Sequence, residues 1–458
     1  MDNNLLRFFT LMDGQGYPVV KEAPRFDLDM YIGNYKGRTR FDRLILIGRS
    51  CVPLCIDALK AAIVDAKKGR DIQRYKEAVD CLQIAAPLEP EAVLDQAWIN
   101  QKEAENKDIT NRLLTELKGY KNNLIKESIR MGHEDMGKHL EATGDLNLAA
   151  ESFMKMRPDV STTKQYIDVA KHLVRVSIHR REWSMVTAHL SKLQGTAQLT
   201  DDEEKQLSAY MRIAHGIAYL GQEKYLDAAL SFLEADNVAP TVYNEIASPN
   251  DVAIYGGLLA LAFMNRSELQ TKVLDNVKFR EFLELEPNIR RAVSQFVSGR
   301  YSACISTLEA YRTDCLLDIY LQRHVKTIFQ QIRNKCIVQY LIPFSRVSLD
   351  TMAKAFGSPD QPIEDELADM IKAGTLQAKI DLIDRLVVTM SANQRAHMQN
   401  MALKTAKVYE RQAIDRLNRM GLVAAELDIR PLTAKFSAMR GMMTQQGDRM
   451  NEQLENVV

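Results

Sequence analysis

Residues 348–390 decide how the rest of the chain is interpreted, and they read SLDTMAKAFGSPDQPIEDELADMIKAGTLQAKIDLIDRLVVTM. The pattern predicts one short helix over residues 352–356 and a second over residues 362–374. An early proline, acids in the first turn and a glycine after the last turn are usual helix boundaries. Residues 376–380 then alternate between apolar and polar, and residues 386–389 are β-branched, which predicts two short strands around a turn.

Two helices followed by a hairpin, after a long helical pattern over residues 321–341, is the order of a winged helix. Winged helices commonly bind DNA, so the charge of the second helix is informative. That helix carries four acids against one basic residue, a net charge of −3, from Glu364, Asp365, Glu366, Asp369 and Lys372. A groove-reading helix should be basic, because neutralising phosphates supplies most of the affinity. We therefore do not expect nucleic acid as the partner.

The hairpin suggests a different use. An outer strand leaves N–H and C=O groups unpaired, and another protein can complete them by adding a strand. The sequence therefore predicts a protein-docking module. Its expected contact residues lie along the hairpin edge: Leu376, Ala378, Ile380, Leu386 and Val388.

The composition is that of an intracellular globular protein. The 458 residues are long enough for two or three domains, and the 60 basic and 60 acidic residues balance. Glycine and proline are few and strand patterns are scarce, which favours a mostly all-α chain. The six cysteines are too sparse for a disulfide framework, so we expect buried reduced thiols and an intracellular compartment. No signal peptide is expected, and the longest apolar run, residues 252–265, is too short to span a membrane.

Two segments repeat the same spacing of small and aromatic residues. Glycine precedes alanine by twelve residues and alanine precedes phenylalanine by four in both, at Gly137, Leu140, Gly144, Ala149 and Phe153, and again at Gly216, Tyr219, Gly221, Ala228, Phe232, Ala235 and Pro240. This looks like the tetratricopeptide pattern, in which each helix pair has an apolar face that it buries by stacking. The fold prediction is a TPR-like helical-repeat solenoid, then a winged helix, then a long C-terminal helix.

The expected domain boundaries follow from these patterns. We predict, in order, a flexible arm over 1–25, an N-terminal helical region over 26–117, TPR-like repeats over 118–330, the winged helix over 331–391, a bundle helix over 392–422 and a mobile tail over 423–458.

The C-terminal helix carries a narrow apolar stripe suited to bundling with other helices. Its expected contact residues are Met398, Ala402, Ala406, Tyr409, Ala413, Leu417 and Met420. Six basic residues against two acids give the same helix a net charge of +4. An acidic partner would fit this charge, but a solvated face next to the bundle contact is the simpler explanation.

A search for reactive groups predicts no catalytic, cofactor-binding or metal site. None of the eight histidines lies in an H-x-H or H-E-x-x-H motif, and neither a Walker loop nor a G-x-S-x-G elbow is present. Cys–His pairs assemble in space and stay open at this point.

Helical repeats followed by a winged helix and a C-terminal helix resemble the PCI family, shared by the proteasome lid, the COP-nine signalosome and a translation initiation factor. The local sequence looks most like the subunit-one group of the signalosome, over residues 117–136, 248–257, 282–287 and 316–321, with an N-terminal echo at residues 27–43. The resemblance covers residues 27–409. The tail beyond Gly421 departs from it.

The resemblance implies a non-catalytic scaffold. The signalosome removes the ubiquitin-like modifier Nedd from cullin-RING ubiquitin ligases, and its zinc isopeptidase lies in another subunit. A subunit of this kind is expected to meet neighbouring PCI subunits, such as subunits two and three, edge to edge, and to add its last helix to a common bundle. The alternatives are the homologous proteasome-lid subunit and a PCI protein that binds nucleic acid.

Overall fold

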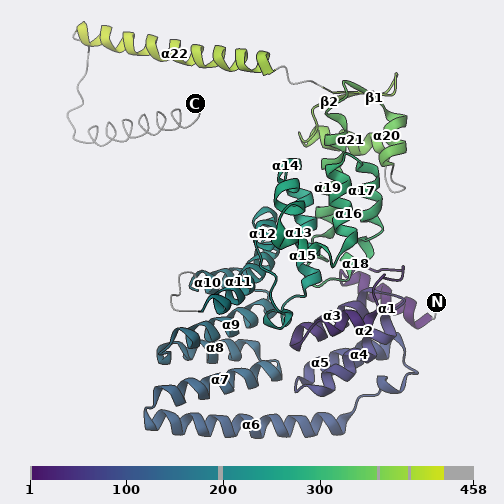
Figure 1. The fold of residues 1–458 in the computed structure, drawn as a ribbon, viewed down its shortest axis with the longest axis vertical. Coiled ribbons are helices and arrows are strands. Elements are labelled where there is room, and N and C mark those ends of the chain that lie inside the picture. The colour runs from purple at the N-terminus through teal and green to yellow at the C-terminus, as the bar shows by residue number, and fades with distance from the viewer. Residues whose placement is uncertain (1–2, 194–199, 358–361, 390–393, 426, 428–458) are drawn as a thin grey trace. The chain divides into compact units, whose positions relative to one another are not determined.

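The structure is a computed structural model that describes residues 3–193, 200–357, 362–389, 394–425 and 427. It divides into two units, Met1–Thr389 and Met390–Val458, which are treated separately below. The first unit is helical apart from one small sheet (Figure 1). The predicted fold class, mostly α with helical repeats before a winged helix, is confirmed.

The first helices form an N-terminal layer with its own apolar core. They are α1 (Asn3–Gly14), α2 (Leu28–Gly33), α3 (Gly37–Ser50), α4 (Cys55–Lys68), α5 (Ile72–Ala85), a 3-10 turn (Pro90–Ala92) and the long α6 (Gln96–Asn123). The segment expected to be a flexible arm differs from that expectation. It contains α1, whose Phe8, Phe9 and Met12 are buried, and Val20 pairs with Cys51 in a short bridge. The spacing of these apolar residues suits a helix that packs one face onto the layer.

Helix pairs then stack into a solenoid. They comprise α7 (Lys126–Thr143), α8 (Leu146–Lys155), α9 (Thr163–His179), α10 (Trp183–Ser191), α11 (Asp201–Gly221), α12 (Tyr225–Leu233), α13 (Pro249–Phe263), α14 (Arg266–Glu268), a π-helical turn (Leu269–Leu274), α15 (Val277–Leu283), α16 (Pro287–Val297), α17 (Tyr301–Glu309), α18 (Arg312–Leu316) and α19 (Val325–Leu341). A Cβ on Gly137 would lie 2.4 Å from the Phe153 ring, and one on Gly216 would lie 2.6 Å from the Phe232 ring. The repeated glycine–phenylalanine spacing therefore marks the same close helix contact twice.

Four helix pairs share one turn conformation. Each turn contains a residue in the left-handed region: Gly144, Arg181, Glu223 and Gly299, with φ of 100°, 57°, 62° and 77°. The following residue has φ near −90° in every case, from −80° to −91°. Glycine occupies this position twice, as its lack of a Cβ favours, and a charged residue occupies it twice.

The winged helix consists of β1 (Arg346–Ser348), α20 (Leu349–Phe356), α21 (Ile363–Lys372), β2 (Ala378–Asp381) and β3 (Leu386–Thr389). Ser348 caps α20 by accepting a hydrogen bond from the Thr351 N–H. The module shares one apolar core with the repeats, through residues such as Met352, Leu367 and Val387. Arg333 on α19 also donates to both oxygens of Glu366, at 2.6 and 3.0 Å. The winged helix is therefore continuous with the solenoid.

The second unit contains α22 (Gln394–Ala424), close to the predicted limits of the bundle helix. The large apolar side chains described on this helix are at least half exposed. A short helix expected near residues 434–443, and most of the expected tail, lie outside the described residues.

Candidate functional site

The sheet of the winged helix has the order β1-β3-β2, so β3 lies in the centre. Leu386 pairs with Asp381 on β2 and with Ser348 on β1, and Val388 also has a partner on each side. The predicted placement of Leu386 and Val388 at an open edge is therefore wrong. The three residues of β1 are too few to produce a visible alternation in the sequence, so the strand that covers β3 was not predicted.

The open edge on this side of the sheet belongs to β2. Leu376 and Ala378 are buried, at 6% and 5% exposure, and Ile380 packs against the same core. These side chains anchor the strand and leave its backbone edge, with Lys379 and Asp381, toward solvent. Whether this edge is an interface stays a prediction.

The turn between β2 and β3 presents two large apolar side chains to solvent. Leu382 is 70% exposed and Ile383 is 94% exposed. Neither residue was among the predicted contacts. Apolar side chains at the tip of an otherwise polar turn suit a contact with another protein.

The predicted residues of the C-terminal helix lie on one side of α22. Their spacing of four, four and three residues places them within an arc of about 100°, at 100° per residue. Met398 and Tyr409 are each 73% exposed, and Leu417 and Met420 are each 67% exposed. We call the seven predicted residues of this side the α22 apolar face: Met398, Ala402, Ala406, Tyr409, Ala413, Leu417 and Met420. Within the described part of the second unit, nothing covers this face.

A buried polar junction joins the N-terminal layer to the solenoid. Arg43 on α3 is fully buried and forms ion pairs at 2.8 Å with both Asp251 on α13 and Asp318, which follows α18. The Arg43 guanidinium also donates to the Tyr31 and Tyr255 hydroxyls. Because burying one arginine between two carboxylates needs each group to be paired, the cluster fixes how these segments pack.

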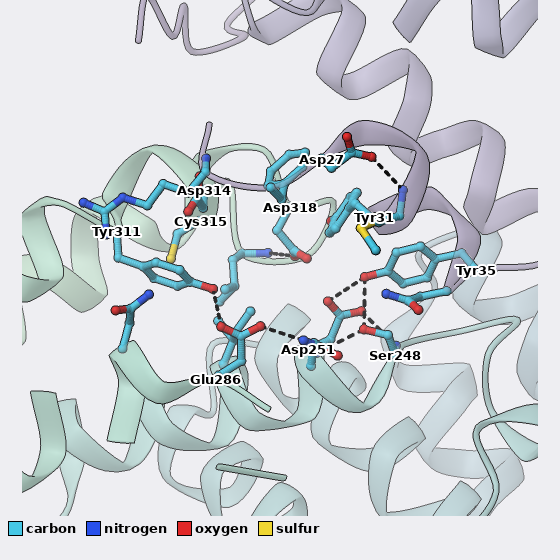
Figure 2. A pocket seen from close by; sticks show the side chains of 18 residues that line it. Asp27, Tyr31, Tyr35, Ser248, Asp251, Glu286, Tyr311, Asp314, Cys315 and Asp318 are labelled. Atoms are coloured by element: carbon cyan, nitrogen blue, oxygen red, sulfur yellow. Dashed lines mark hydrogen bonds between the residues drawn. The ribbon is translucent and has the colours of Figure 1, made fainter. Parts of the chain in front are cut away.

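The same junction includes the start of α13. Ser248 and Asp251 form a capping box, and the Tyr35 hydroxyl donates to Asp251 at 2.8 Å, as Figure 2 shows. Sequence reasoning did not find this cluster, because Tyr35 and Arg43 are more than 200 residues away from Asp251. The Ser-Pro-Asn-Asp stretch was the only part with a local pattern, that of a capped helix.

A cavity of about 320 Å³ lies beside the junction (Figure 2). Its carboxylates are engaged by the chain itself: Asp251 as above, Glu286 by Asn250 and Tyr311, and Asp314 by the backbone N–H of Arg25. Burial raises the pKa of Asp251 to about 6 against the opposing effect of Arg43, and burial also raises the pKa of Glu286. These groups hold the surrounding segments together through hydrogen bonds within the chain.

The cavity also contains a thiol, Cys315, which is buried and unpaired with another cysteine. Burial raises the pKa of the Cys315 thiol well above its usual value, so the reactive thiolate is disfavoured. All six cysteines are free and buried, as predicted. Across the described residues, no group of three or more histidine, cysteine, aspartate or glutamate side chains is arranged to hold a metal ion. The helices of this described portion are also too short or too polar to cross a membrane.

Two family models match the chain. The 26S proteasome subunit RPN7 model matches residues 95–272, which span α6 and the solenoid to the π-helical turn. The PCI domain model matches residues 308–391, which include the winged helix.

Relatives match along nearly the full chain. COP9 signalosome complex subunit 1 of Neurospora crassa is 55% identical over 431 residues, covering 94% of each chain. The Arabidopsis thaliana protein of the same name is 36% identical, over 90% of this chain and 93% of its own. By comparison, the 26S proteasome non-ATPase regulatory subunit 6 of Dictyostelium discoideum is 22% identical over 68% of this chain. The chain therefore belongs to the family of COP9 signalosome complex subunit 1.

Proposed function

We propose that this chain is a non-catalytic scaffold subunit of a signalosome that acts in the cytoplasm and nucleus. In this role it supports the removal of Nedd from cullin-RING ubiquitin ligases, and the isopeptidase centre lies in another subunit. Its neighbours are other PCI subunits, with subunits two and three as the expected pair, and it reaches the ligases through the complex.

The observation that carries the proposal is the α22 apolar face. A helix with four large side chains at least two-thirds exposed on one side is poorly suited to water, and burying each in a bundle stabilises association by about 1.5–3 kcal/mol. The open edge of β2 and the exposed Leu382 and Ile383 add a second surface. Two separate contacts on one chain suit a subunit held by several neighbours.

The test replaces three exposed residues of the α22 apolar face: Met398→Lys, Tyr409→Lys and Leu417→Lys. The matched control changes the opposite side of the helix: Lys404→Ala, Lys407→Ala and Arg411→Ala. The full chain is co-expressed with the other subunits, and co-purification and cleavage of Nedd from a modified cullin are measured. We expect the apolar-face variant to lose both and the control to keep both.

Point substitutions are preferable to deleting the winged helix, because that module shares the core of the repeats and its removal would expose apolar surface. A complex that assembles normally with the apolar-face variant would contradict the bundle contact. Chelator-sensitive cleavage of a modified cullin by the purified chain alone would contradict the non-catalytic role.

A further inference from the structure

A second cavity, of about 870 Å³, differs from the first in the sign of its charge. We call it the basic groove. It is lined by the turn after α1, by α3, by the α9–α10 turn and by residues 312–326, segments from four parts of the chain. Its charged side chains are five cations and two carboxylates: Arg49, Arg181, Arg312, Arg323, Lys326, Asp13 and Asp42.

Three of the cations form no ion pair among the described side chains, although Arg181 lies near enough to the Asp42 carboxylate to interact with it electrostatically, and Asp13 in the same lining is also without an ion pair. Arg49 pairs with Glu77 at 2.7 Å and Arg312 pairs with Glu309 at 3.5 Å, while Asp42 is already paired with Arg74. Among the described side chains, Arg181, Arg323 and Lys326 form no ion pair, and all three are exposed. Like charges placed together without partners repel, so an anion bound among them would be favoured.

The backbone at Arg181 supports a role for its side chain. This residue occupies the left-handed position of the α9–α10 turn, where two of the four equivalent turns have glycine. A residue with a Cβ is sterically disfavoured there. Backbone strain of this kind is often found at functional sites, and here the side chain that accompanies it lines the groove.

The rest of the lining narrows the class of ligand. Ile45 and Leu46 are buried at the groove, and Leu316 and Ile319 are half-buried beside them. A small inorganic anion would gain no binding free energy from contact with these apolar side chains. Arginine predominates among the cations, and its planar fork matches carboxylates.

We propose that the basic groove binds an acidic peptide segment of a partner protein. Its carboxylates pair with Arg181, Arg323 and Lys326, and an apolar side chain between them lies on Leu316 and Ile319. The groove is formed by residues 13–18, 42–49, 181 and 312–326, so this contact is separate from α22 and from the sheet edge. It is tested on the chain alone, and its outcome does not depend on assembly of the complex.

The probe is a fluorescent short peptide of alternating glutamate and leucine, added to the purified full chain and followed by anisotropy. We expect saturable binding that weakens as salt rises. Arg323→Glu with Lys326→Glu should raise the Kd by about tenfold or more, because two attractions become repulsions. Arg181→Gly should also weaken binding while the melting temperature stays equal or rises, which a purely structural role would not produce.

The control is Arg290→Glu with Arg291→Glu, two exposed arginines of α16 outside the groove, and it should leave the Kd unchanged. A matched peptide of alternating lysine and leucine should not bind. If the glutamate peptide binds equally well to the Arg323→Glu, Lys326→Glu variant, the proposal is overturned. It is also overturned if only tripolyphosphate, and not the glutamate peptide, binds in a way that depends on these residues.

Discussion

The polar junction around Arg43 and the α22 apolar face differ in where each finds its partners. At the junction, charged side chains whose burial would be unfavourable if they were unpaired form ion pairs within the chain. Arg43 is 208 residues from Asp251 and 275 residues from Asp318. On α22, apolar side chains whose burial would be favourable remain exposed in the described part of their unit. The first region stabilises one fold, and the second is suited to association. Four experiments test this contrast.

The largest effect is expected from Arg43→Met. Removing one partner of a buried ion pair leaves the other charges unpaired and typically costs about 3–5 kcal/mol. Here Asp251 and Asp318 would face each other without a cation. Urea denaturation measures the loss. The control is Arg40→Met on the same helix, whose pair with Asp65 at 3.3 Å involves a 39% exposed side chain and should contribute less than about 1 kcal/mol. If both variants lost the same free energy of unfolding, the junction would not be a main source of stability.

Gly137→Ala should destabilise the repeats by about 1–3 kcal/mol, because the added methyl would press on the Phe153 ring at 2.4 Å. Gly119→Ala on α6 meets no atom within 4 Å and should be stabilising, by up to about 1 kcal/mol. Thermal melts of the two variants should therefore move in opposite directions. A shift in the same direction would contradict the close contact.

Acid should destabilise the first unit through three histidines, of which His189 is buried and His172 and His179 are partly buried. Burial, assisted by nearby cations, lowers the pKa of His172 and of His189 to about 4 and of His179 to about 3. The unfolded chain then binds more protons than the folded chain below pH 6.5, so stability present at pH 7 is lost as pH falls. Asp251 opposes this, because its raised pKa favours the folded state as it takes up a proton. The net loss between pH 7 and pH 5.5 is expected to be on the order of 3 kcal/mol, because each histidine contributes about 1.2 kcal/mol and Asp251 returns about 0.8 kcal/mol. Urea midpoints at the two pH values measure it, and an unchanged midpoint would contradict the burial of these rings.

The smallest effect is expected on α22. Tyr409→Lys with Leu417→Lys should change the free energy of unfolding of the isolated chain by less than about 0.5 kcal/mol, because surface substitutions remove no packing. The same double variant should no longer co-purify with the other subunits. A large loss of stability in the isolated chain would mean that the chain covers its own α22 apolar face, which would end the contrast.

Local patterns were sufficient for much of the fold. The helix predicted over residues 362–374 corresponds to α21, whose limits are Ile363 and Lys372. The repeated spacing that begins at Gly137 and Gly216 predicted two equivalent helix pairs, and the structure contains both. These features depend on neighbours within one helix pair, so a short window contains the information.

Long-range features were not predicted for the same reason. The partners of Arg43 come from helices far apart in the sequence, and no local spacing indicates them. The strand β1 gains its structure from pairing with β3, and its three residues carry no period of their own. The docking residues Leu386 and Val388 were misplaced because that pairing was unseen. The order of the predicted elements therefore indicated the winged helix but not which of its strands has a free hydrogen-bonding edge.

The shared core of the repeats and the winged helix has a mechanical consequence. One cluster of buried apolar residues includes side chains from Ile167 of the repeats to Val387 of the winged helix, so packing couples the two parts even though the connecting residues 342–346 are exposed. A partner that fixes the orientation of the small sheet would therefore also fix the orientation of the solenoid that shares its core. Small differences in how neighbours seat this module would be magnified into large displacements at α6.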